Sequence, residues 1–155
     1  MERRDVLKSA STLAAASTVG LAGCGGILGG GCSKPKDDFK KSMPDSDDYK
    51  GEVSTGSGEG SEDIKKTASG FYEGPDGNGY YFVIIEFSSK DVASEKAKNA
   101  SSNTGSSSND GAAGYIVTGK YGYTAGGPSK EKVKTFMKTS PTLSDGCVDN
   151  NVEFV

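Results

Sequence analysis

The chain has 155 residues, a formal net charge of −3 and only 33% hydrophobic residues. Its length is enough for one small domain and excludes large multidomain machinery. It contains no His and no Trp. Without His, the Ser-His-Asp, Cys-His and His-metal mechanisms are excluded. Because the two arginines are Arg3 and Arg4, no arginine remains elsewhere to cluster around phosphates, and nucleic-acid binding is not expected.

Residues 1–23 have the pattern of a removable export signal, with a short basic head followed by a weakly apolar run at 9–21. As a helix, residues 9–23 would be about 22 Å long, which is short of the roughly 30 Å core of a bilayer. A permanent membrane span is therefore not expected. Residues 3–8 (RRDVLK) resemble the twin-arginine export motif, although Val6 stands where that motif often has Phe.

Residues 21–24 (LAGC) resemble a lipobox, the site at which prokaryotic lipoproteins are cleaved and lipidated on the new terminal Cys. Together the two motifs make the amino terminus similar to that of twin-arginine-exported lipoproteins, which are common in haloarchaea, although the pI of 5.0 is less acidic than usual there. The resemblance implies a lipid on Cys24, transient contact with the export machinery, and a location on the extracytoplasmic face of the cell membrane. The alternative is a frayed amphipathic helix in which Cys24 is an ordinary thiol.

Residues 24–63 are expected to form the lipidated Cys, a Gly-rich tether at 25–31 and an irregular segment. Within that segment, residues 37–43 predict a short helical turn that places Phe39 and Met43 on one side. Residues 51–60 are rich in Gly and Ser, which indicates either a loop or a weak edge strand.

Residues 64–155 predict an α+β domain. Apolar residues on both faces of 80–88 indicate a central strand, and the turn formers at 74–79 favour a hairpin with a strand at 64–72. Ser88 with Asp91 resembles a capping box that opens a helix ending near residue 100.

The second half repeats this pattern. Residues 115–118 and 121–125 are strand-like, although spacing leaves open whether they form one long strand, and 130–139 predict a helix. Its expected inner face is Val133, Phe136 and Met137. Two strand-strand-helix units favour a small antiparallel four-stranded sheet with both helices on one face.

Two features of the sequence suggest covalent modification. Cys32 and Cys147 are candidates for a disulfide outside the cytoplasm, the alternative being two unrelated thiols. Asn99 begins the sequon Asn-Ala-Ser, which makes it a candidate for N-glycosylation, although such tripeptides are frequent by chance.

Tyrosines are the candidate binding residues. If one sheet face is uncovered, an aromatic patch for carbohydrate or peptide is expected at Tyr115, Tyr121 and Tyr123, with Tyr72 and Tyr80 as further candidates. The alternative, which the sequence favours, is that these rings cap a small core and expose their hydroxyls at its edge. The acidic loops at 45–48 and 76–79 lack the pattern of a calcium loop, so no metal or other cofactor is expected.

The features together predict an exported, membrane-anchored lipoprotein that is not an enzyme and that binds a small ligand or another envelope protein. One alternative is a structural spacer of the cell envelope. A second is a carboxylate-dependent hydrolase, which would need two of Glu73, Glu86 and Asp91 in a shared cleft.

Overall fold

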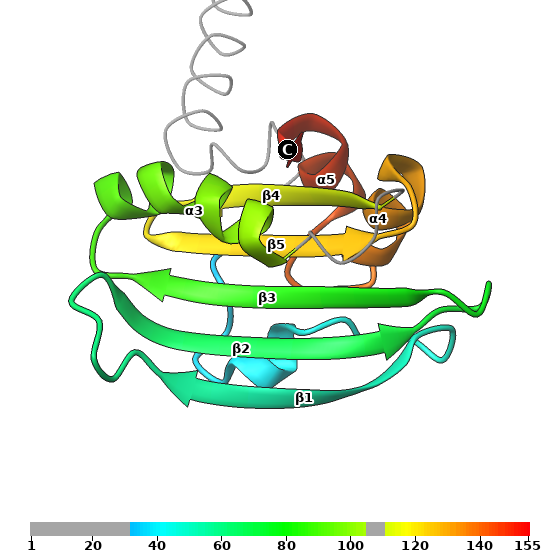
Figure 1. The fold of residues 1–155 in the computed structure, drawn as a ribbon, viewed down its shortest axis with the longest axis horizontal. Coiled ribbons are helices and arrows are strands. Elements are labelled where there is room, and N and C mark those ends of the chain that lie inside the picture. The colour runs from blue at the N-terminus through cyan, green and yellow to red at the C-terminus, as the bar shows by residue number, and fades with distance from the viewer. Residues whose placement is uncertain (1–31, 105–110) are drawn as a thin grey trace, which may run out of the picture.

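An antiparallel sheet forms the centre of the structure, a computed structural model that describes residues 32–104 and 111–155 (Figure 1). Within these residues the sheet has six strands in the order β1-β2-β3-β5-β4-β6. The predicted export motif at Arg3 and Arg4 and the lipidation site at Cys24 lie outside the described residues.

The first strand-strand-helix unit consists of β2 (Ile64–Glu73), β3 (Gly79–Phe87) and α3 (Lys90–Thr104). The helix begins one residue later than expected. The Ser89 hydroxyl oxygen, rather than that of Ser88, accepts a hydrogen bond from the Val92 backbone N–H at 3.2 Å. The predicted cap at Ser88 is therefore wrong by one position, and the helix continues four residues beyond its predicted end.

The second unit consists of β4 (Ala112–Thr118), β5 (Tyr121–Gly127) and α4 (Lys130–Met137). The two strands are separate, because Gly119, at a φ of 58°, opens a two-residue turn between them. Ser129 caps α4 by accepting a hydrogen bond from the Lys132 N–H. The three residues predicted for the inner face of α4 are all buried, namely Val133, Phe136 and Met137.

The expected four-stranded sheet is wrong because two further strands extend it. At one edge β1 (Lys50–Ser57) pairs with β2, and at the other β6 (Glu153–Phe154) pairs with β4 after the short helix α5 (Asp145–Asn151). Strand β1 has almost no buried residue, so its sequence carries little apolar alternation. Strand β6 is too short for a period of two to be recognised.

The two long helices lie on opposite faces of the sheet, so the expectation that both cover one face is wrong (Figure 1). Side chains alternate between faces along β3. Phe82 and Ile84 share a core cluster with Phe136 of α4, and we call their side of the sheet the α4 face. Phe87 shares the other cluster with Ala97 of α3, and we call its side the α3 face.

Residues 32–63, expected to be mostly irregular, form part of the domain. The turn η1 (Phe39–Ser42) begins after Asp38, whose carboxylate accepts a hydrogen bond from the Lys40 N–H. Phe39, Met43 and Tyr49 are buried in the same cluster as Phe136. The domain therefore begins near Cys32 rather than at residue 64.

Candidate functional site

The candidate tyrosine face does not form, and Tyr72, Tyr80 and Tyr123 are buried in the core, which is the alternative that the sequence favoured. Tyr123 is fully buried on the α4 face, where its hydroxyl donates to the Ser33 carbonyl at 2.9 Å, and Tyr121 is half-buried on the same face. Tyr115 lies on the α3 face, and its hydroxyl donates to Glu153 at 2.6 Å, which raises the pKa of Tyr115 to about 12. The turn between β4 and β5 pairs Ile116, and not Tyr115, with Tyr123. Tyr115 therefore lies on the face opposite to that of Tyr121 and Tyr123.

Phe71 is the large apolar side chain that the described part of the chain exposes most, with 77% of its surface accessible. It lies on the α3 face of β2, directly across from Tyr81 of β3. In Figure 1, α3 crosses β4 and β5, and no described helix covers this face of β1 and β2. The exposed aromatic ring on this face is therefore Phe71, and Tyr81 beside it is half-buried.

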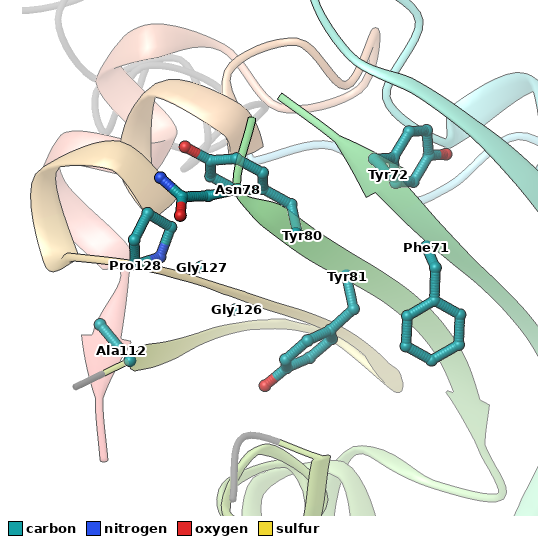
Figure 2. A pocket seen from close by; sticks show the side chains of 11 residues that line it. Phe71, Tyr72, Asn78, Tyr80, Tyr81, Ala112, Gly126, Gly127 and Pro128 are labelled. Carbon is teal, nitrogen blue, oxygen red and sulfur yellow. The ribbon is translucent and has the colours of Figure 1, made fainter. Parts of the chain in front are cut away.

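A cavity of about 410 Å³ adjoins these rings. The ladder between β3 and β5 ends at Tyr81 and Gly126, whereas β3 still pairs with β2 as far as Gly79 and β5 pairs with β4 through Gly127. The two central strands thus separate at one end of the sheet. We call the resulting cavity the notch; Figure 2 shows its aromatic, glycine and proline walls.

Two glycines of β5 set the shape of the notch. A Cβ on Gly126 would lie 2.0 Å from Cε1 of Tyr81, so the Tyr81 ring rests directly on the β5 backbone. A Cβ on Gly127 would likewise lie 2.7 Å from Cδ1 of Tyr80. Any side chain at Gly126 would push the Tyr81 ring away, because the contact is closer than two carbon atoms tolerate.

The turn beside the notch is held by Asp76. Its Oδ2 accepts hydrogen bonds from the Lys132 ammonium at 2.7 Å and the Tyr80 hydroxyl at 2.9 Å, and its Oδ1 accepts from the Asn78 N–H at 3.1 Å. The hydrogen bond from Lys132 is the largest of several causes that hold the pKa of the Asp76 carboxyl well below its usual range. Asp76 is therefore an ionised, paired anchor for the turn rather than a proton donor.

Two of the carboxylates proposed for hydrolysis, Glu73 and Glu86, lie at opposite ends of the β2–β3 hairpin. Glu73 pairs in register with Gly79 at one end of the β2–β3 hairpin, and Glu86 pairs with Lys66 at the other. The distance along β3 is about 24 Å at about 3.4 Å per residue. Glu86 is also bound to the Lys120 ammonium at 2.7 Å. A glycosidase pair stands no more than about 9.5 Å apart, so this pair does not have that geometry.

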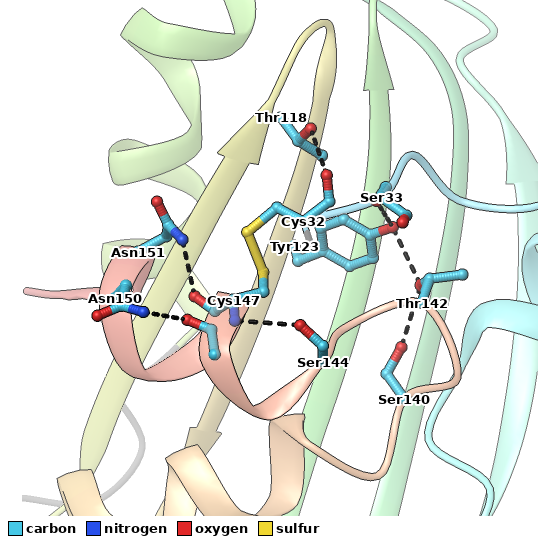
Figure 3. The surroundings of a disulfide bond; sticks show 11 residues. Cys32, Ser33, Thr118, Tyr123, Ser140, Thr142, Ser144, Cys147, Asn150 and Asn151 are labelled. Carbon is cyan, nitrogen blue, oxygen red and sulfur yellow. Dashed lines mark hydrogen bonds between the residues drawn. A yellow bond between two sulfur atoms is a disulfide. The ribbon is translucent and has the colours of Figure 1, made fainter. Parts of the chain in front are cut away.

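Cys32 and Cys147 form a disulfide, with Cα atoms 4.9 Å apart (Figure 3). Cys147 is fully buried in α5, and its N–H donates to the hydroxyl of the cap residue Ser144. The Cys32 carbonyl accepts a hydrogen bond from Thr118 at the end of β4. The described chain thus begins at the end of the β4–β5 hairpin that lies away from the notch.

Asn99, the candidate glycosylation site, is exposed on α3. The helix continues through its sequon to Thr104, so the site is not at the helix end as expected. Among the described residues, no helix combines the length and the hydropathy needed to cross a membrane. The same residues contain no group of three or more Cys, Asp or Glu side chains placed to hold a metal ion.

Neither a family model, nor a curated protein, nor a solved structure matches the chain.

Tyr72 offers a test of packing next to the notch. It is 6% exposed, and its hydroxyl has no hydrogen-bond partner among the described residues. We expect Tyr72→Phe to raise the free energy of unfolding by about 1 kcal/mol, because an unsatisfied buried hydroxyl is removed. Urea titration at neutral pH measures this change, and a loss of stability would contradict it.

The same substitution has an expected pH signature. Burial, helped by the charge of Asp45, raises the pKa of Tyr72 to about 12, from 10.0. As the pH rises, Tyr72 therefore ionises in the unfolded chain before it ionises in the folded protein. The free energy of unfolding of the parent protein is unaffected by the ionisation of this group below pH 10 and falls as the pH rises from 10 to about 12. Tyr72→Phe should make the alkaline loss of stability less steep, and unfolding midpoints between pH 9 and about 12 measure the slope.

Proposed function

We propose that this chain is an exported lipoprotein, held on the extracytoplasmic face of the cell membrane by a lipid on Cys24, whose domain is a non-catalytic binding module. Phe71 and Tyr81 beside the notch are the observation that carries the binding role. Burial of exposed apolar area is the main source of binding energy, and cavities of this size are typical of small-ligand sites.

The disulfide supports the location. A bond between Cys32 and Cys147 persists in an oxidising compartment and is rare in the cytosol, where thiols are kept reduced. This observation is independent of the motifs at residues 3–8 and 21–24, which lie outside the described part of the chain.

The position of Cys32 in the domain supports the orientation of the module. Cys24 and Cys32 are eight positions apart, and eight residues span at most about 29 Å when fully extended. Cys32 is bound to Thr118, whereas the notch lies near Ala112 at the other end of β4, about 20 Å away at about 3.3 Å per residue. The notch is therefore proposed to point away from the membrane, toward ligands outside the cell.

The lipid anchor is tested with Cys24→Ser in the full-length gene, followed by fractionation of the cells. We expect the parent protein in the membrane fraction and the variant in the soluble or secreted fraction, because the lipid supplies the anchoring energy. Cys147→Ser is the matched control, since it replaces a cysteine outside the lipidation site, at the cost of the disulfide, and should leave any folded protein on the membrane. Equal membrane association of the parent and the Cys24 variant would contradict a lipid at this site.

The binding role is tested by fragment screening with ¹⁵N-labelled protein from residue 25 onward. We expect small aromatic and heterocyclic fragments to shift the amide signals of Tyr81 and Gly126, because binding cavities concentrate such fragments. Phe71→Ser should reduce these shifts, whereas Val155→Ala, which removes the other exposed large hydrophobic side chain, should leave them unchanged. Fragments scattered over the surface without preference would instead favour the structural spacer.

A further inference from the structure

We propose that the notch binds an uncharged sugar ring, either a free saccharide or one unit of a polysaccharide outside the cell. This inference rests on the binding role proposed above and adds the chemical class of the ligand. The argument uses the charge of the lining, the placement of the rings and the position of the notch in the sheet.

The lining of the notch carries no charge. Its described side chains are aromatic rings, an alanine, a proline and the Asn78 carboxamide, and the remaining walls are glycine backbone. The nearby Asp76 carboxylate is neutralised by its ion pair with Lys132. An anionic ligand would lose its hydration inside this lining and gain no opposite charge in return. A neutral ligand does not incur this cost.

Phe71 and Tyr81 suit the apolar face of a sugar. The two residues are directly opposite in the β2–β3 pair and both line the notch; the Phe71 ring is largely exposed, and the Tyr81 ring lies against the backbone of Gly126. Ser69 and Glu73 share the face of Phe71 and place a hydroxyl and a carboxylate beside it. A pyranose presents C–H groups on its faces and hydroxyls around its edge, which matches an aromatic surface with polar groups at the rim.

The position of the notch argues against a peptide added as an extra strand. Such a peptide pairs with the edge of a sheet, which on this side is β1. The notch lies between β3 and β5, so β2 separates it from β1, and β4 separates it from the opposite edge strand, β6. A peptide paired with β1 would therefore leave the notch empty. The cavity volume, near the lower end of the range for ligand sites, also favours a small rigid ring.

The test is a titration of ¹⁵N-labelled protein from residue 25 onward with methyl glucoside, methyl mannoside, methyl galactoside and short dextran oligomers at millimolar concentrations. We expect saturable shifts of the Gly79, Tyr81, Gly126 and Gly127 amides with at least one neutral saccharide. A preference for dextran oligomers over methyl glucoside would identify a polymer as the source, and equal binding would identify the free sugar. Galacturonate, methylated lysine and a neutral tripeptide serve as the anionic, cationic and peptide probes.

Phe71 provides the matched variants. Phe71→Ala should weaken saccharide binding about tenfold, because a stacking ring is lost, whereas Phe71→Tyr should retain it. Both variants should keep the parent's unfolding midpoint, since the side chain is largely exposed. No saturable shift with any neutral saccharide, or tighter binding of a charged or peptide probe, would overturn the inference. If fragments still gather in the notch, the binding role stands and only the ligand class is wrong; if they do not, both proposals fail.

Discussion

Loss of the disulfide is expected to lower the free energy of unfolding by about 4 kcal/mol, because a cross-link that closes a loop of more than 100 residues removes much of the entropy of the unfolded chain. Cys32 and Cys147 are 115 positions apart, so the loop encloses nearly all of the described domain. The change is Cys32→Ala with Cys147→Ala, and urea titration of the protein from residue 25 onward measures it.

The reduced parent protein is the control for this prediction. A reductant should bring its unfolding midpoint down to that of the double variant and should leave the variant itself unchanged. Because Cys147 is fully buried, part of the effect of its replacement could come from packing, and the reduced parent separates the two causes. Equal midpoints for the oxidised parent and the double variant would contradict a stabilising bond.

Replacing Phe136 by alanine is the second substitution with a large expected effect. Its ring lies within 6.0 Å, centroid to centroid, of four other aromatic rings, which belong to Tyr49, Tyr72, Tyr80 and Phe82. Phe136 is fully buried, so the substitution leaves a cavity and is expected to cost about 3 to 5 kcal/mol. Thermal and urea unfolding of the variant measure the loss.

Phe71→Ala is the matched control for Phe136→Ala. It removes the same atoms from a side chain that is 77% exposed, and so it should change the free energy of unfolding by less than about 0.5 kcal/mol. Because Phe136 joins the α4 face to Tyr49 near β1, its loss should also weaken the docking of residues 32–49. A cost below about 1 kcal/mol for Phe136→Ala would show that this aromatic cluster is not the centre of the core.

The sequence predicted most of the elements that have strong periodicity. The apolar pattern of β3 and the inner face of α4 were read correctly, because a buried strand and an amphipathic helix leave clear repeats. Strand β1 is exposed and β6 is short, so neither carries such a repeat. The assignment of both helices to one face failed although β3 is apolar on both sides, a pattern that itself requires cover on both faces.

The candidate site was harder to predict. Phe71 carried a local signal, since it is the one large apolar residue among Thr67, Ser69 and Glu73 on the same face of β2. The notch carried none, because it depends on where the pairing of β3 with β5 ends, and these strands are distant in sequence. The prediction of a shared tyrosine surface was wrong because the two-residue turn at Gly119 places Tyr115 on the face opposite to that of Tyr121 and Tyr123.

The bond between Cys32 and Cys147 would also have a mechanical consequence if, as proposed, a lipid on Cys24 tethers the protein by its amino terminus. Any pull on the tether enters the domain at Cys32, and the sulfur atoms pass part of that load directly to α5. Residues 33–49 could not leave the sheet without α5 moving with them, because the disulfide joins Cys32 to Cys147. Tension on the tether would therefore be shared by two segments of the domain rather than one, and neither segment contributes a residue to the lining of the notch.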